Sequence, residues 1–394
     1  MTTKEVVESQ IPANRELATG EGAKTKGRSR FLALDALRGL IIVLMALDHA
    51  NYFVAQQHSS GEHWGGVFPA YSDGLTFLTR WVTHPVAPGF MFLMGAGMAL
   101  FANSRRNRGW SEWQLIRHFL IRGGLLITLQ LLVVNRAWGL GAAPFPSIYI
   151  GVLFALGGGM ILGSLFLRFR VWHLAGFAIA LFILTELSHP GPSEWGQNFG
   201  QPLGLLFGYS GGDGQLWSNY PILPWLELVI FGMAIGKWML VDAERALKWG
   251  LALGLTFLAG FVVLRGLDGF GNIRPIEGDT WIDFLNVVKY PPAMTFTLVT
   301  MGINLTLLWL FSRAGELGSR LIQPLVVFGK APLFFYLAHL FLYAAIGILL
   351  TPSGTSIPEM YPYWLIGLLI LFPPTLWYGA FKHRQPPNSL FHFL

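Results

Sequence analysis

An arginine and a histidine lie within the first long apolar run of this 394-residue chain. Arg38 and His49 are eleven residues apart, a separation that returns to nearly the same face of an α-helix, roughly 16 Å further along its axis. Asp35 lies one turn before Arg38 and can pair with it. Ionisable groups at membrane depth are costly, so each is a functional candidate. A structural ion pair, with His49 as a satisfied core histidine, is an equally weighted alternative.

A second histidine follows in the next apolar run, which begins Arg80-Trp81-Val82-Thr83-His84-Pro85. We expect His84 to lie at a depth similar to that of His49, beside prolines whose freed backbone groups need protein or a wet cavity nearby. An imidazole titrates near neutral pH and can take a proton from a hydroxyl or an amine. This pattern predicts a polar pocket in which His49 is the base and His84 orients or assists it. Capping of a kinked helix is the alternative for His84. For Asp48, which precedes His49 in the sequence, we expect a solvated, interfacial role.

Weaker candidates lie elsewhere in the chain. Lys330 approaches the membrane from the predicted cytoplasmic side and could meet an anionic ligand or extend to the interface. His339, with Tyr336 one turn before it, lies in the middle of an apolar run, where packing and a supporting role are equally expected. Arg105 and Arg106 could attract nucleotide phosphates, although charges at such positions more often set membrane topology. Glu227 is an isolated acid without an obvious partner.

The amino-acid composition indicates that the elements that position these residues lie in a membrane. Charged residues make up 12% and apolar residues 53% of the chain, and the mean hydropathy is +0.50. A soluble domain carries about 25% charged residues, so the solvent around this chain must be lipid. The net charge of +6 is spread in short clusters between apolar runs, which argues against nucleic acid as a partner. We find no Walker loop, HExxH spacing or nucleophile elbow and expect no metal.

Runs of about 20 apolar residues predict an all-α, polytopic helical bundle. Every second loop between these runs is rich in arginine and lysine, which predicts that both termini are cytoplasmic. The expected organisation is a disordered tail (1–30), a transmembrane domain (31–382) and a short tail (383–394). A glycine-rich segment around 197–209 would make eleven spans instead of ten. The ten predicted spans are 31–53, 78–102, 116–134, 146–166, 171–188, 220–238, 247–265, 288–311, 322–350 and 362–381.

Several blocks of sequence resemble the bacterial relatives of heparan-α-glucosaminide N-acetyltransferase, within the wider transmembrane acyltransferase superfamily. The resemblance covers the chain from about residue 30 to its end, and the first two blocks are the more specific. The blocks are Leu34-Asp35-Ala36-Leu37-Arg38-Gly39-Leu40 through Asp48-His49-Ala50, Arg80-Trp81-Val82-Thr83-His84 with Ala87-Pro88-Gly89-Phe90-Met91-Phe92-Leu93-Met94-Gly95, Tyr220-Pro221-Ile222-Leu223-Pro224-Trp225, Lys289-Tyr290-Pro291-Pro292, and Phe328-Gly329-Lys330-Ala331-Pro332 through His339.

This resemblance implies a multi-pass protein of the cytoplasmic (inner) membrane that moves an acetyl or other short acyl group from cytosolic acetyl-CoA. The implied acceptor is an extracytoplasmic glycan, amino sugar or other envelope molecule. His49 and Arg38 match the superfamily's first-span histidine and arginine, whereas the animal heparan enzymes use a slightly later histidine. His58 and His63 are therefore alternatives to His49. A proton-coupled transporter using the same Asp, Arg and His is the rival function, and an envelope scaffold is a third. The sequence leaves a homo-oligomer open.

Overall fold

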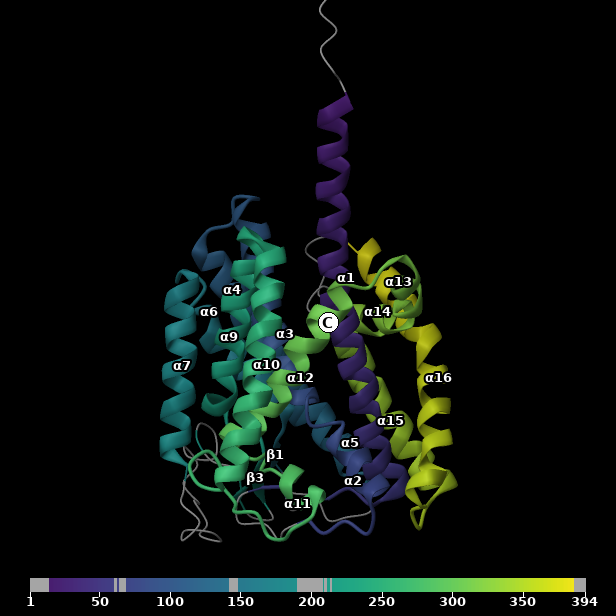
Figure 1. Ribbon diagram of the computed structural model, residues 1–394. Coiled ribbons are helices and arrows are strands. Elements are labelled where there is room, and N and C mark those ends of the chain that lie inside the picture. The colour runs from purple at the N-terminus through teal and green to yellow at the C-terminus, as the bar shows by residue number, and fades with distance from the viewer. Residues whose placement is uncertain are drawn as a thin grey trace, which may run out of the picture.

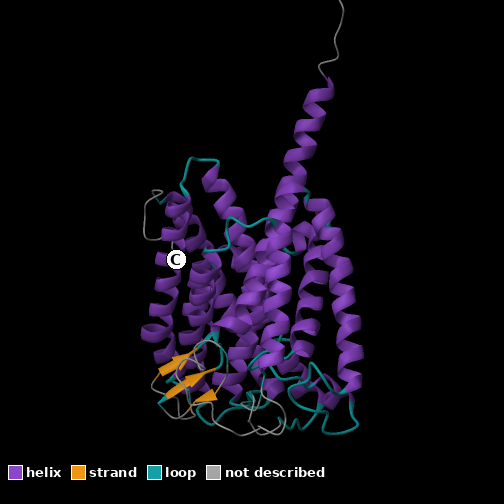
Figure 2. Cartoon of the chain, turned by 90° about the vertical axis from the view of Figure 1, so that its left-hand side faces the viewer, coloured by secondary structure: helices purple, strands orange, loops and turns teal. Residues whose placement is uncertain are grey.

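The computed structural model describes residues 14–59, 62–63, 69–141, 148–189, 208, 211–212 and 215–385. In this part of the chain, long helices run side by side and form an upright bundle (Figure 1). A small three-stranded sheet, in the order β1-β3-β2, lies at the end of the bundle opposite the start of α1 (Figure 2). The strands are β1 (Ile148–Ile150), β2 (Gly211–Gly212) and β3 (Leu216–Ser218). The predicted all-α class is therefore confirmed, with a minor sheet at one end.

The helices of the first half are α1 (Asn14–Ala50), α2 (Gly74–Trp81), α3 (Val86–Arg106), α4 (Glu112–Leu129), α5 (Asn135–Trp138), α6 (Val152–Ser164) and α7 (Val171–Ser188), with π-helical turns η1 (Asn51–Ala55) and η2 (Gln130–Val134). Those of the second half are α9 (Ile222–Val241), α10 (Ala243–Leu267), α11 (Trp281–Leu285), α12 (Met294–Ser312), α13 (Glu316–Leu321), α14 (Gln323–Lys330), α15 (Pro332–Leu350) and α16 (Ile357–Arg384).

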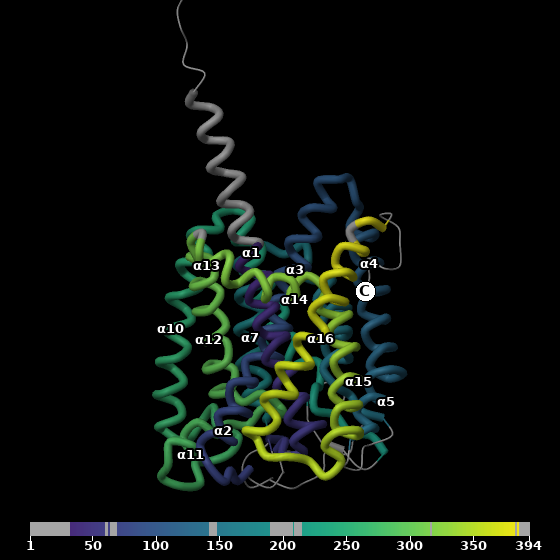
Figure 3. The backbone as a smooth tube through the Cα atoms, turned by 90° about the vertical axis from the view of Figure 1, so that its right-hand side faces the viewer, coloured from purple at the N-terminus to yellow at the C-terminus, as the bar shows by residue number. Residues whose placement is uncertain are grey.

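Eight helical segments of the described residues are long and apolar enough to cross a membrane, and α6 is a shorter apolar helix. Helix α1 also runs through the bundle, between α12 and α15 (Figure 1). Large apolar side chains exposed on α7, α10 and α16 face outward, as lipid contact requires. The chain is thus a polytopic membrane protein. Helix α16 ends at the same end of the bundle at which α1 begins (Figure 3), which agrees with an even number of spans.

Two predicted spans are broken near a proline. The second predicted span divides into α2 and α3 at residues 82–85, and the ninth divides into α14 and α15 at Ala331. Pro85 precedes α3 and Pro332 is the first residue of α15. A proline lacks the N–H that continues a helix, but its fixed φ suits a helix start. Each break therefore places the end of one helix and the start of the next inside the bundle, where side chains can converge.

Several predicted boundaries change, and the changes at the starts of α1 and α12 move whole segments. Helix α1 begins at Asn14, so most of the predicted disordered tail is helical, because extending an existing helix needs no new nucleation. Helix α12 begins at Met294, which leaves Lys289 in the loop before it. The 197–209 segment lies outside the described residues except for Gly208, and the second tail, 383–394, lies outside them from residue 386.

Candidate functional site

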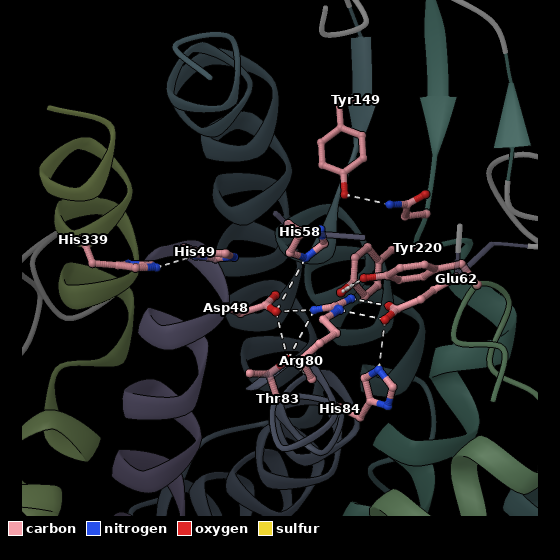
Figure 4. A network of polar contacts seen from close by, with 12 residues as sticks. Asp48, His49, His58, Glu62, Arg80, Thr83, His84, Tyr149, Tyr220 and His339 are labelled. Atoms are coloured by element: carbon pink, nitrogen blue, oxygen red, sulfur yellow. Dashed lines mark hydrogen bonds and ion pairs between the residues drawn. The ribbon is translucent and has the colours of Figure 1, made fainter. Parts of the chain in front are cut away.

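The end of α1 places His49 against the middle of α15. The Nδ1 atom of His49 lies 2.6 Å from Nε2 of His339, and Nδ1 of His339 lies 2.9 Å from the carbonyl oxygen of Phe335. The two imidazole planes differ by 14° and the ring centroids are 4.8 Å apart, which is compatible with a hydrogen bond between the two ring edges. His49 is 7% exposed and His339 is fully buried. Sequence analysis placed both residues inside apolar runs, and the structure brings them together as one histidine pair (Figure 4).

A cavity of about 330 Å³ lies between α1, α3, α4, α6, α14, α15 and α16. Its walls are mostly apolar, but four basic side chains line it: Arg38, Arg122, Lys330 and Lys382. The Tyr336 side chain also lines this cationic pocket, and its ring meets those of His49 and His339 edge-on, with centroids 6.4 and 5.7 Å away. Neither histidine lines the pocket, so Tyr336 is the residue that lies between its cluster of positive charge and the predicted base.

Two of the four cations have no acidic partner among the described residues. Arg122 and Lys382 make no ion pair there, and Nε of Arg122 is buried without a hydrogen bond. Arg38, by contrast, donates to Asp35 Oδ1 over 2.8 Å and to the carbonyl oxygen of Gly329 over 3.0 Å. Unpaired cations in a largely apolar cavity create a strong preference for an anionic ligand. Neither Arg122 nor Lys382 was selected from the sequence as a ligand contact.

Glycines allow α1 and α14 to touch backbone to backbone. A β-carbon on Gly39 would overlap the carbonyl oxygen of Leu325, and one on Gly329 would overlap that of Asp35. This close approach puts the start of the α14–α15 break directly beside α1. It also explains why Arg38 can reach Gly329, and why Lys330 lines the same pocket as Arg38.

The predicted phosphate contacts Arg105 and Arg106 lie elsewhere. Arg106 donates to Glu112, with Nε 2.6 Å from Oε1, and the Arg105 guanidinium lies over the rings of Phe101 and Trp110. Neither side chain lines the cationic pocket. The ion pair and the ring contacts give both arginines structural roles at the turn between α3 and α4.

A second polar group, the acid–arginine network, lies beyond His49 (Figure 4). Arg80 of α2 pairs with both Asp48 and Glu62, and its Nε is 2.7 Å from Glu62 Oε1. Thr83 donates to Asp48 over 2.9 Å. His84 lies 3.1 Å from Glu62 Oε1, so it is held by an acid and makes no contact with His49. The expectation of a solvated Asp48 is wrong, because the buried guanidinium of Arg80 draws the carboxylate inward.

The network fixes the loop before α2. Burial raises the pKa of the Glu62 carboxyl, but Arg80 and His84 outweigh this effect and hold that pKa well below its usual range. The backbone oxygen of Glu62 accepts from the amides of Lys289 and Tyr290, each over 3.1 Å. Glu62 therefore joins the α2 side of the bundle to the loop before α12. Its loop position carries no periodic signal, so sequence analysis could not find it.

The remaining predicted residues fall into structural positions. His58 lies 3.5 Å from Asp48, and the His63 ring meets that of Trp217 at 5.0 Å. Glu227 does have a partner, since the Thr185 hydroxyl donates to it over 2.9 Å. Arg265 is fully buried and donates to the carbonyl oxygens of Arg274, Asp283, Phe284 and Asn286, which organises the loop between α10 and α12.

Taken together, an intramembrane histidine pair beside a cationic pocket defines a polytopic membrane protein with a candidate active site inside the bilayer. Residues 30–264 match the family described as heparan-alpha-glucosaminide N-acetyltransferase, catalytic, and the chain belongs to this family.

Two curated relatives carry that enzyme's name. The protein from Mus musculus is 32% identical over 130 residues, which is 33% of this chain and 18% of the relative. The protein from Homo sapiens is 31% identical over 129 residues, 32% of this chain and 17% of the relative. The matched segment thus spans less than a fifth of either relative.

Proposed function

We propose that this protein transfers an acetyl or other short acyl group from cytosolic acyl-CoA to an amine or hydroxyl of an extracytoplasmic sugar. The observation that carries this proposal is the cationic pocket, which is lined both by four basic side chains and by Tyr336 beside His49. Family membership supports acetyl transfer. Membership of this family also favours a transferase over the rival transporter.

The donor's phosphates fit the basic residues of the pocket. Guanidinium groups bind phosphate oxygens through several donors at once, and an ammonium adds a point charge. In sequence analysis, Arg38 could stabilise either the thioester carbonyl or a phosphate. Because His49 is roughly 16 Å further along α1, and Arg38 lines the same pocket as Lys330, we assign Arg38 to the phosphates. The pantetheine arm then bridges the apolar part of the pocket.

The chemical step takes place at His49. The acceptor's nitrogen or oxygen attacks the thioester carbonyl, and His49 Nε2 takes the proton that the acceptor loses. Collapse of the tetrahedral intermediate breaks the carbon–sulfur bond and forms the amide or ester, and the leaving CoA thiolate takes the proton from Nε2 of the His49 imidazolium, which returns His49 to its neutral form. The base is uncharged before the reaction, which limits the cost of burying it in the membrane.

Orientation follows from the basic loops. Arg105, Arg106, Arg168 and Lys248 lie on loops or helix ends at the end of the bundle where α1 begins. The positive-inside bias assigns that end to the cytoplasm. The acid–arginine network and the small sheet are then extracytoplasmic, on the side from which we expect the sugar to approach. The names of the relatives favour an amino sugar as acceptor.

The test is transfer of radiolabelled acetyl from acetyl-CoA to glucosamine by protein in liposomes. We expect His49→Gln to lower kcat by roughly 10²–10⁴ while the protein still binds acetyl-CoA. His173→Gln, an exposed residue of α7, is the matched control and should keep full activity. Full transfer by a folded His49→Gln protein would show that another histidine acts, and His58→Gln is the variant to measure next.

A further inference from the structure

The histidine pair contains an ordered set of donors and acceptors. The carbonyl oxygen of Phe335 can only accept a hydrogen bond, so the proton of neutral His339 must lie on Nδ1, 2.9 Å from that oxygen. The Nε2 atom of His339 then carries a lone pair. Since it lies 2.6 Å from Nδ1 of His49, the proton between the two rings must come from His49.

This chain of contacts determines which nitrogen of His49 is free. A neutral imidazole carries one proton, and in His49 that proton is on Nδ1. The basic lone pair is then on Nε2, on the edge of the ring that faces away from α15. With the other tautomer, two lone pairs would meet between the rings at 2.6 Å, which is strongly repulsive.

The orientation of His339 is itself fixed by its surroundings. Its ring is fully buried, with the Phe335 ring parallel to it within 16° at 5.2 Å. The rings of Tyr336 and Tyr343 contact it edge-on at 5.7 and 6.3 Å. This packing holds Nε2 toward α1, so His339 can act as a rigid acceptor in a part of the bundle that water does not reach.

We propose that His339 is a positioning residue for acyl transfer: it accepts a hydrogen bond from Nδ1 of His49, fixes the tautomer of that ring and stabilises the imidazolium formed when Nε2 takes the acceptor's proton. This inference rests on the proposed function. Catalytic triads commonly use a carboxylate in this position. A neutral imidazole does the same orienting work without placing a negative charge in the middle of an apolar bundle, where an ionised acid is costly.

Two substitutions separate positioning from packing. His339→Leu removes the acceptor, and we expect it to lower kcat by roughly 10²–10⁴ with little change in KM for acetyl-CoA. His339→Gln offers an amide oxygen to the His49 N–H and should recover a large part of that loss. Thermal unfolding and acetyl-CoA binding of both variants show whether the fold and the cationic pocket persist.

A direct readout comes from nitrogen NMR of histidine-labelled protein in nanodiscs. We expect the His49 signals of the wild type to show a protonated Nδ1 and a bare Nε2, and those of His339→Leu to show a mixture of tautomers. A wild-type His49 protonated on Nε2 would overturn the inference, as would equal kcat for folded His339→Leu and His339→Gln. This measurement needs no turnover, so it remains informative even where the proposed transfer fails.

Discussion

Asp48 and His49 are neighbours in sequence, yet their side chains belong to two separate polar groups. Asp48 turns toward α2 and pairs with Arg80, whereas His49 turns toward α15 and hydrogen-bonds His339. Successive residues of a helix point about 100° apart, so the last turn of α1 can serve both groups at once. One group holds the loops before α2 and α12 in place, and the other packs against Tyr336, which lines the cationic pocket.

The unpaired cations of the pocket predict a defect that depends on the nucleotide of the donor. We expect Arg122→Gln and Lys382→Gln each to weaken acetyl-CoA binding roughly 10–100-fold, because each removes a charge-assisted contact to a phosphate. Lys248→Gln, on the exposed side of α10, is the control. Binding can be measured by titration calorimetry in detergent.

A donor without phosphates gives the contrast for that experiment. Acetyl-pantetheine lacks the nucleotide, so its transfer should be nearly equal in the wild type and in both variants. Equal losses with acetyl-CoA and acetyl-pantetheine would mean that Arg122 and Lys382 contribute to the pocket's shape and make no contact with phosphate.

The contact between α1 and α14 predicts a strong steric effect. Gly39→Val would push a side chain into the Leu325 carbonyl, so we expect a destabilisation of about 1–3 kcal/mol and weaker acetyl-CoA binding, because Arg38 and Lys330 move apart. Gly124→Val on α4, where a β-carbon meets nothing within 4 Å, should be close to neutral. Thermal unfolding in detergent measures both, and equal midpoints for the two variants would contradict the packing argument.

Removing Arg80 should be among the most damaging substitutions. Arg80→Met leaves the carboxylates of Asp48 and Glu62 without their buried cation, which typically costs about 3–5 kcal/mol. Arg80→Lys should recover little, since a lysine cannot reproduce the paired contacts to Glu62. Arg108→Met, at an exposed position, is the control. Stability like that of the wild type in Arg80→Met would show that the network contributes little.

Lys289 predicts a pH dependence of stability. Burial, together with nearby Arg80, lowers its pKa from 10.5 to about 8 against the opposing effect of Asp48 and Glu62. Between these two values the unfolded chain binds the proton more tightly, so folding stability rises with pH. We expect the unfolding midpoint of the wild type, relative to Lys289→Met, to increase from about pH 7.5 to about pH 9.5. A constant difference would show that Lys289 is solvated.

Much of this architecture could be predicted from local sequence. Apolar runs identified the helices, and helical periodicity placed Arg38 and His49 on one side of α1, because both depend only on neighbours along the chain. The histidine pair depends on the contact between α1 and α15. The pairing of Arg80 with Glu62 depends on the conformation of the loop before α2. Those contacts are set by tertiary packing, so His49 and His339 could each be selected while the contact between them could not. Arg122 lies inside the predicted span 116–134, so the rule that selected Arg38, an ionisable group at membrane depth, could have selected Arg122 as well.

The central claim is that acetyl passes from a donor on one side of the membrane to an acceptor on the other. Its most direct test uses liposomes in which the α1 end of the protein faces outward, with glucosamine enclosed and radiolabelled acetyl-CoA added outside. We predict that label accumulates on enclosed glucosamine with the wild type and is lost with His49→Gln. Label appearing only on glucosamine supplied outside, with none on the enclosed sugar, would contradict transfer across the bilayer.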